Sequence, residues 1–240
     1  TLCVFLAGSV LFFFMIPSRP LLPSGEKESL LKGLTAGIRF VFGNQVVLCT
    51  LSLDLFAVLF GGAVAMLPIF ASDILQVGPE GLGILRAAPF AGSVITGLLL
   101  AHRPPMARAG SYLLWAIGGF GIATILFALS TSFYLSLFLL FLTGAFDSIS
   151  VIIRGTILQL LTPDHMRGRV SAVNNVFIGS SNEIGAFESG LAAKLMGLIP
   201  SVIFGGSMTI LIVLATAGFS PAIRKLNMRK IQEQLNNGEL

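Results

Sequence analysis

Charged residues are scarce in this sequence. Asp, Glu, Lys and Arg make up 11% of its 240 residues, against about a quarter in an ordinary soluble domain. Apolar residues make up 55%, and the mean hydropathy is +0.91. A soluble core does not require so much apolar sequence. The scarcity of charge therefore argues against a soluble domain and predicts an integral membrane protein.

Cysteine and histidine are also scarce, with two of each. Cys3 and Cys49 lie in apolar runs without a CxxC spacing, so we expect neither a disulfide framework nor a metal site. His102 and His165 lie in short polar segments far from any matching ligand. The motifs HExxH and GxSxG are missing, which argues against an enzyme and predicts no cofactor. No basic stripe with interleaved aromatic residues is present, so we expect no nucleic-acid partner.

Proline, glycine and charge interrupt the apolar sequence near its start. Residues 1–16 begin without Met and are short for a span, which needs about 20 residues. We expect them to be the end of a further transmembrane helix. Residues 17–45 predict a linker, in which Leu30, Leu34 and Ile38 recur at helical spacing. This spacing indicates a short amphipathic helix lying on the membrane surface.

Six long apolar segments occupy residues 46–220. They cover about 46–74, 78–101, 111–129, 133–156, 170–194 and 201–220. Each can cross a hydrocarbon core of about 30 Å at about 1.5 Å per residue. Because a backbone in lipid must satisfy its own hydrogen bonds, each segment is predicted to be a helix. The expected fold class is an all-α membrane protein, with a six-helix bundle followed by a polar tail at 221–240.

Basic residues orient the predicted bundle. If the linker is cytoplasmic and the segments alternate, 13 of the 15 Lys and Arg residues lie on the cytoplasmic side. The other two are Arg86, inside the second segment, and Lys194, near the end of the fifth. The positive-inside rule therefore places both the linker and the tail in the cytoplasm.

Charged residues lie deep within four of the six apolar segments, and their distribution repeats. Asp54 lies in the first segment, Arg86 in the second, Asp147 in the fourth, and Glu183 and Glu188 in the fifth. The third and sixth segments carry none. An ionisable group inside a membrane costs at least about 2.5 kcal/mol on insertion scales, so it normally faces a polar route. Two triplets of helices with matching charge positions are typical of the 3+3 inverted repeats of secondary transporters.

The fifth segment carries a polar arc on a helical wheel. Asn182 and Glu188 fall with several small or polar residues within about 140°, whereas Glu183 lies off this arc and could face a neighbouring helix. These residues are candidates for a substrate or proton pathway, together with Asp54, Arg86 and Asp147. A structural alternative stays open: a buried acid can simply pair with Arg86 or a backbone donor, and Arg86 can snorkel to the outer surface.

The segment that joins the fourth and fifth spans carries further charges. Asp164, Arg167 and Arg169 lie in it, and Arg154 falls on the same predicted cytoplasmic side. These side chains could bind lipid headgroups, or pair with acids and so hold the cytoplasmic side shut. The alternative is that the positive charges only orient the bundle.

Several stretches of the sequence together resemble the major facilitator superfamily, in particular the carboxy-terminal half of members of its enterobactin-exporter-like branch. The matching stretches are SLDLFAVLFGGAVAMLPIFASDIL, VGPEGLGILRAAPFAG and the long run 144–190. The loop LAHRPPMARAG resembles the superfamily's cytoplasmic signature only loosely, since it lacks the acidic residue. A gating role for that loop is therefore not carried over.

The resemblance implies a transporter of twelve helices in two halves, in a bacterial inner membrane. The expected function is proton-coupled export of a siderophore or a drug-like small molecule by alternating access. The expected partners are this substrate, protons, membrane lipids and an amino-terminal six-helix half. Two alternatives remain open: translocation of a lipid or lysophospholipid, and a truncated half-transporter that transports nothing.

Overall fold

A computed structural model describes residues 30–61, 63–102, 108–219, 226 and 228. The chain divides into two compact units, Thr1–Gly33 and Leu34–Leu240, and all the packing described below lies within the second unit. The predicted helix end at 1–16, the first part of the linker, and the predicted tail other than Leu226 and Met228 lie outside the described residues.

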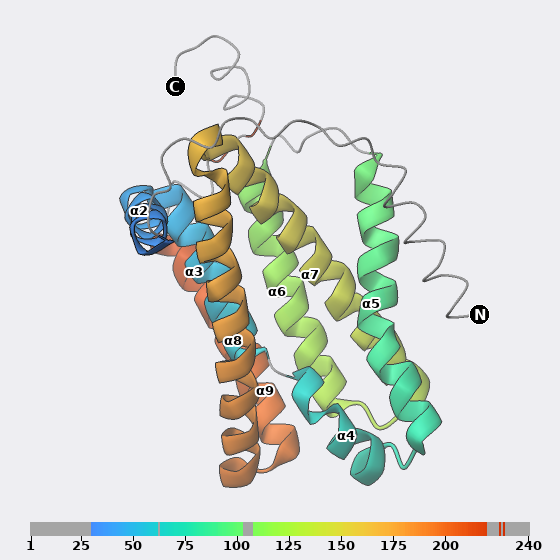
Figure 1. Cartoon of the computed structure of the whole chain (residues 1–240). Helices are drawn as coiled ribbons and strands as arrows, with labels where there is room; N and C mark the ends of the chain where they lie inside the picture. Colours follow the sequence, from blue (N-terminus) through green and yellow to red (C-terminus); the bar gives the residue numbers. More distant parts are fainter. Residues whose placement is uncertain (1–29, 62, 103–107, 220–225, 227, 229–240) are drawn as a thin grey trace, which may run out of the picture. The chain divides into compact units, whose positions relative to one another are not determined.

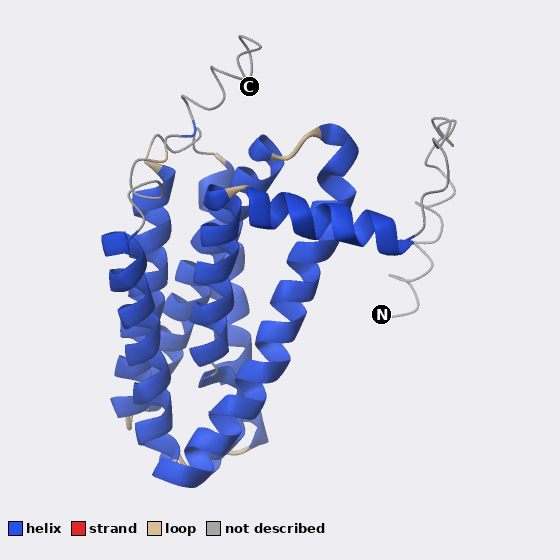
Figure 2. Ribbon diagram, turned by 90° about the vertical axis from the view of Figure 1, so that its left-hand side faces the viewer, coloured by secondary structure: helices blue, strands red, loops and turns tan. Residues whose placement is uncertain are grey.

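Helices make up almost all of the described chain, and no strand occurs in this part of it (Figure 2). The α-helices are α2 (Leu30–Gly43), α3 (Gln45–Phe60), α4 (Leu67–Ile69), α5 (Pro79–Ala101), α6 (Ala109–Leu129), α7 (Phe133–Leu161), α8 (Arg167–Met196) and α9 (Leu198–Phe219). Three short turns of other helical types are η1 (Ala63–Met66), η2 (Phe70–Ile74) and η3 (Asp164–Met166). The predicted all-α fold class is confirmed.

Five helical stretches are long and apolar enough to cross a membrane. They are Gln45–Ile74, Pro79–Ala101, Ala109–Leu129, Phe133–Leu161 and Leu198–Gly218. The remaining predicted span corresponds to α8, which is long enough with 30 residues but more polar than the others. Six long helical stretches therefore follow the linker, as the sequence predicts, and one of them is distinguished by its polarity.

The helix boundaries follow from local chemistry. Asn44 caps α3, because its side-chain oxygen accepts hydrogen bonds from the backbone N–H groups of Val46 and Val47 at 3.1 and 3.2 Å. Gly78 precedes Pro79 at the first turn of α5, which confirms the predicted start of that helix. The first span, by contrast, is not one continuous α-helix. It stops at Phe60 and resumes as the short turns η1, α4 and η2.

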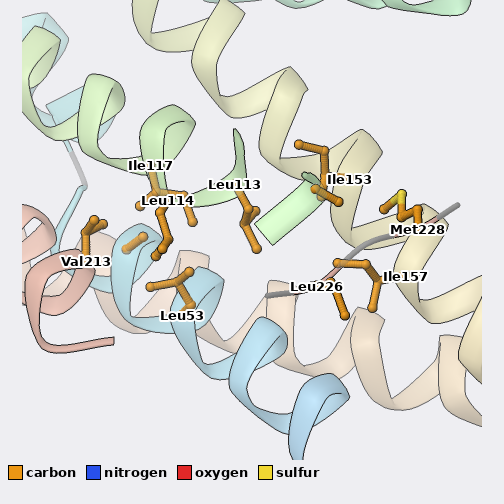
Figure 3. Close-up of a cluster of buried hydrophobic side chains, with 11 residues drawn as sticks. Leu53, Leu113, Leu114, Ile117, Ile153, Ile157, Val213, Leu226 and Met228 are labelled. Carbon is orange, nitrogen blue, oxygen red and sulfur yellow. The ribbon is translucent and has the colours of Figure 1, made fainter. Parts of the chain in front are cut away.

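The long helices pack in two groups, α5 with α6 and α7, and α3 with α8 and α9, which meet mainly through α6 and α9 (Figure 1). Helix α7 packs against α5 and α6, while α3 packs against α8 and α9, and α6 packs against α9. Buried side chains from α3, α6, α7 and α9 form one hydrophobic cluster, which includes Leu53, Leu113, Ile153 and Val213 (Figure 3). Together these contacts join the two groups into one bundle.

The contact between α5 and α7 depends on two glycines. A Cβ atom on Gly144 would overlap the backbone of Pro89, and one on Gly92 would overlap the backbone of Phe141. Because the two backbones touch, Ser93 can donate a hydrogen bond across the contact to the carbonyl of Gly144 at 2.9 Å. Small residues allow such close approach of helices in membranes. This pair of helices therefore forms a closely packed support for the charges that α7 carries.

Helix α2 has two apolar sides. Gly37 and Val41 are buried, and a Cβ atom on Gly37 would lie 2.9 Å from the carbonyl oxygen of Arg169 in α8. Ile38 and Phe42, on the other side, are 41% and 60% exposed. A helix lies at the predicted place, and its amphipathic role on the membrane surface stays a prediction.

Candidate functional site: a buried charge cluster

A buried ion pair joins α3 to α7. The Nη1 atom of Arg154 contacts the Oδ2 atom of Asp54, and the two residues are 4% and 6% exposed. An acid with a basic partner at contact distance can remain ionised away from water, because each charge compensates the other. The structure thus identifies Arg154, and not Arg86, as the partner of Asp54.

The structure corrects the predicted placement of Arg154. The sequence pattern places it on the cytoplasmic side, at the very end of a span predicted to end near residue 156. Helix α7 in fact continues to Leu161, so Arg154 lies almost two turns inside the helix. Its guanidinium group is enclosed by the bundle and is not available to a lipid headgroup.

A second carboxylate lies beside this ion pair. Asp147 and Ser150 precede Arg154 by seven and four positions in α7, a spacing that puts the three side chains on one helix face. Asp54, Asp147 and Ser150 line a small cavity between α3, α6 and α7, together with the rings of Phe120 and Phe146 and the side chains of Ala57, Val58 and Ile117. Asp54, which pairs with Arg154, and the half-buried Asp147 therefore line one largely apolar cavity.

The hydroxyl of Ser150 is unusual among the buried hydroxyls. It is 2% exposed, and its Oγ atom has no hydrogen-bond partner among the described residues. Other hydroxyls in these helices donate to a carbonyl one turn back, such as that of Thr50 to Val46 at 2.7 Å and that of Thr143 to Leu140 at 2.7 Å. A buried polar group normally has a partner, so Ser150 indicates a place for one.

The candidates on α8 do not join this cluster. Asn182 and Glu183 are exposed and Glu188 is half-buried. They therefore lie on a surface of α8 that no described part of the chain covers. The small members of the predicted polar arc lie elsewhere. Ser181 and Gly185 are buried, and a Cβ atom on Gly185 would lie 2.8 Å from the carbonyl oxygen of Leu59 in α3. The predicted single polar arc is therefore divided between a helix contact and an open face.

The remaining candidates lie apart from the cluster. Arg86 is exposed on α5, and neither of the ion pairs found in the described part of the chain involves it. Asp164 and Arg167 form an exposed pair at 2.9 Å where α8 begins. Arg169 is half-buried close to α2. These charges thus lie at the end of the bundle or on its open face.

Sequence reasoning missed Ser150 and the position of Arg154. The signal was the spacing of Asp147, Ser150 and Arg154 in one apolar stretch, which puts all three on one face of a helix. That spacing gives no partner on another helix, so it does not reveal the pair with Asp54. No group of three or more His, Cys, Asp or Glu side chains that could hold a metal ion occurs among the described residues.

Comparison with known families gives the identity of this bundle. A family model described as transmembrane secretion effector matches residues 13–237. The chain belongs to this branch of the major facilitator superfamily. It is a multi-pass membrane protein, and its described helices fit one half of such a fold.

Curated relatives of this secretion-effector chain include enterobactin exporters. It is 28% identical over 202 residues to enterobactin exporter EntS of Escherichia coli O81 (strain ED1a), which is 83% of this chain and 48% of the relative. The same values hold for enterobactin exporter EntS of Shigella boydii serotype 18 (strain CDC 3083-94 / BS512). The chain thus spans about half the length of the curated relatives it matches.

Proposed function

We propose that this chain is the carboxy-terminal half of a secondary transporter that exports a small molecule by alternating access, driven by protons. The observation that carries the proposal is the cluster of Asp54, Asp147 and Arg154 inside the apolar bundle. Ionisable groups are costly in a membrane and mark ion or substrate pathways there. The family supports a transporter, and the cluster supports coupling to an ion.

The proposed substrate is a siderophore or a drug-like small molecule. The support is that the relatives it matches are enterobactin exporters. The proposed partner is an amino-terminal six-helix half, because the matched relatives are about twice as long as the matched region. The open face with Arg86, Asn182 and Glu183 would then contribute to the wall of a central pathway.

The proposed location is a bacterial inner membrane, with the linker and the tail in the cytoplasm. The charge asymmetry supports this orientation, since its basic residues gather on the side of the linker. Asp164, Arg167 and Arg169 would then lie near the cytoplasmic membrane surface, where they are suited to contact headgroups or acids of the other half.

Everted membrane vesicles that contain the native protein test this proposal. Addition of a catechol siderophore or a cationic dye should release protons from the vesicle lumen as the compound enters. Asp147→Asn should abolish this proton movement, because the asparagine cannot exchange a proton. The matched control is Asp73→Asn, since Asp73 is an exposed aspartate in η2, away from the cluster.

Two outcomes would overturn the proposal in different ways. Unchanged proton movement in Asp147→Asn would remove this carboxylate from the coupling role. Flipping of a labelled lysophospholipid, with no movement of either compound, would favour lipid translocation. An apolar groove of about 810 Å³ between α6, α7 and α9, with Tyr112 and Trp115 in its wall, is the feature that favours this second candidate.

A further inference from the structure

We propose that the apolar groove between α6, α7 and α9 holds one anionic phospholipid of the cytoplasmic leaflet, which stays bound there. Its acyl chain would lie in the groove, and its headgroup would meet Arg108 and the basic residues of the tail. The inference rests on the proposed orientation of the bundle and not on transport, because this lipid remains in its own leaflet. Three observations support it: a groove that helix packing does not require, positive charge at one end of the groove, and a tail anchored at the same end.

The groove is a space that the packing of the helices leaves open. It has a volume of about 810 Å³ and a mostly apolar wall, within the size range of ligand pockets. Gly118 lies in this wall, and a Cβ atom there would lie no closer than 3.9 Å to a neighbouring atom, Cγ1 of Val213. A Cβ atom on Gly121 would instead lie 3.0 Å from the carbonyl oxygen of Gly206 in α9. Gly121 thus serves the helix contact, whereas Gly118 leaves room that no described side chain fills.

The length of the groove suits an acyl chain of one leaflet. Its wall follows α6 from Ser111 to Leu126, a distance of about 22 Å at about 1.5 Å per residue. One leaflet contributes half of a hydrocarbon core of about 30 Å. Tyr112 and Trp115 are exposed at the predicted cytoplasmic end of this wall, and such side chains are enriched at the level of the headgroups. The acyl chain would therefore run from this aromatic pair toward Leu126.

Positive charge lies at the same end of the groove. Arg108 is exposed and directly precedes α6, and the start of a helix carries the positive end of its dipole. None of the residues that line the groove is charged. A phospholipid with an anionic headgroup matches both the charge and the apolar wall, whereas one with a neutral headgroup matches only the wall.

The tail adds further charge beside the groove. Leu226 and Met228 are buried in the hydrophobic cluster formed with α3, α6, α7 and α9 (Figure 3). Leu114 and Val213 belong both to this cluster and to the groove wall. Four basic residues lie within two positions of Leu226 or Met228 in the sequence: Arg224, Lys225, Arg229 and Lys230. Clusters of about four to eight Lys or Arg residues just cytoplasmic of a membrane helix recognise anionic lipids. These four residues are the proposed partners of the headgroup.

The test uses Trp115 as its probe, because it is the one tryptophan of the 240 residues. The native protein, at its natural length, is placed in phosphatidylcholine vesicles with increasing fractions of a lipid that has brominated acyl chains, which quench nearby tryptophan. The brominated lipid is either phosphatidylglycerol or phosphatidylcholine, and the relevant signal is the part that Trp115→Phe removes. We expect half-maximal quenching at about a tenfold lower fraction of phosphatidylglycerol, and a smaller preference at high salt.

Groove variants tie this preference to the space beside Gly118. Gly118→Leu fills the groove and should remove the preference for the anionic lipid. Gly97→Leu is the matched control, since Gly97 lies in α5 outside the groove and a Cβ atom there would lie 3.8 Å from the Oγ atom of Ser148. It should leave the preference unchanged.

Tail variants test the headgroup contacts, and they decide the question if Gly118→Leu does not fold. Replacement of Arg224, Lys225, Arg229 and Lys230 by glutamine should remove most of the preference. The double variant Leu226→Asn/Met228→Asn keeps all four charges but removes their apolar anchors, so it should weaken the preference as well.

Three results would overturn the inference. Equal quenching by the two brominated lipids would mean that the groove is ordinary lipid-facing surface. Quenching by neither lipid would mean that protein covers the groove, for example a second copy of the chain. A preference that persists both in Gly118→Leu and in the glutamine variant would place the anionic lipid elsewhere.

Lipid binding and export can fail separately. A preference that depends on Gly118 and on the tail, in a protein that moves no compound across vesicles, would uphold the lipid site and refute the exporter. Proton-coupled export together with equal quenching by the two lipids would refute the lipid site and leave the exporter intact.

Discussion

The charged residues of the spanning helices fall into two sets with different surroundings. The inner set consists of Asp54 and Arg154, which are buried as an ion pair between α3 and α7, and of Asp147, which is half-buried beside them. The outer set, Arg86 and Glu183, is exposed on α5 and α8. Asp54 has a base as its partner within the chain, whereas the outer charges face whatever covers the open face. The comparison teaches that, among the described residues of these helices, the fully buried acid is the one with a base beside it.

Helix α8 shows why the outer set is left open. Ser181, Gly185 and Ala192 are buried, and Gly185 brings the backbone of α8 close to that of α3. Glu183 lies two positions from Gly185, which is about 200° around the helix. Close packing of the small residues against α3 therefore turns Glu183 away from the contact and toward the open face.

The largest expected effect comes from breaking the inner pair. Arg154→Gln leaves Asp54 buried without its counter-charge, which costs about 3–5 kcal/mol of stability when one member of a buried pair is removed. We expect a strong fall in the thermal unfolding temperature of the protein in detergent. The measurement is a thermal shift assay that follows the accessibility of Cys49 to a thiol-reactive dye.

The double variant Asp54→Asn/Arg154→Gln is the control for this prediction. It removes both charges and retains polar side chains of similar size, so most of the lost stability should return. The loss of stability in the double variant could instead equal the sum of the losses in the two single variants. The ion pair would then contribute nothing as a pair, and the distinction between the two sets would fail.

A labelling experiment compares the two sets directly, and we expect an effect of intermediate size. In a background without Cys3 and Cys49, Glu183→Cys should react with a hydrophilic maleimide, because a thiol that faces water forms the reactive thiolate. Ser150→Cys should be protected, since position 150 is 2% exposed. The label is counted by mass spectrometry of the intact protein.

The labelling also separates a water-filled pathway from a lipid-facing surface. Slow reaction at both positions would mean that Glu183 faces lipid or a tightly packed partner. Fast reaction at both would mean that the inner cavity is open to water, which would contradict the enclosed cluster.

The smallest expected effect belongs to the loop between α7 and α8. Asp164 and Arg167 form a pair at 2.9 Å with side chains 88% and 54% exposed. Exposed pairs contribute about 0–1 kcal/mol. Asp164→Asn should therefore leave the unfolding temperature within about a degree or two of the parent protein. A loss comparable with that of Arg154→Gln would show that this loop holds the cytoplasmic end together.

Much of the fold could be predicted from the sequence, and less of the site. The start of α5 at Pro79 and the long helices follow from local signals. Two features did not follow. The close approach of the ring of Phe120 to the end of α3 needs Gly61, where a Cβ atom would lie 2.6 Å from that ring. The burial of Arg154 depends on Asp54, far away along the chain. Both features are set by a side chain on another helix.

The sequence by itself determined that this protein consists of long membrane-crossing helices, because a backbone in lipid must satisfy its hydrogen bonds within each segment. It also determined which helices carry charge. Only the tertiary structure decided which charges meet. That Asp147 becomes half-buried and Glu183 exposed depends on which helix face the small residues of α5, α7 and α8 bring into contact. That choice is made by packing between helices, where small residues allow close approach, and not by the order of residues within one helix.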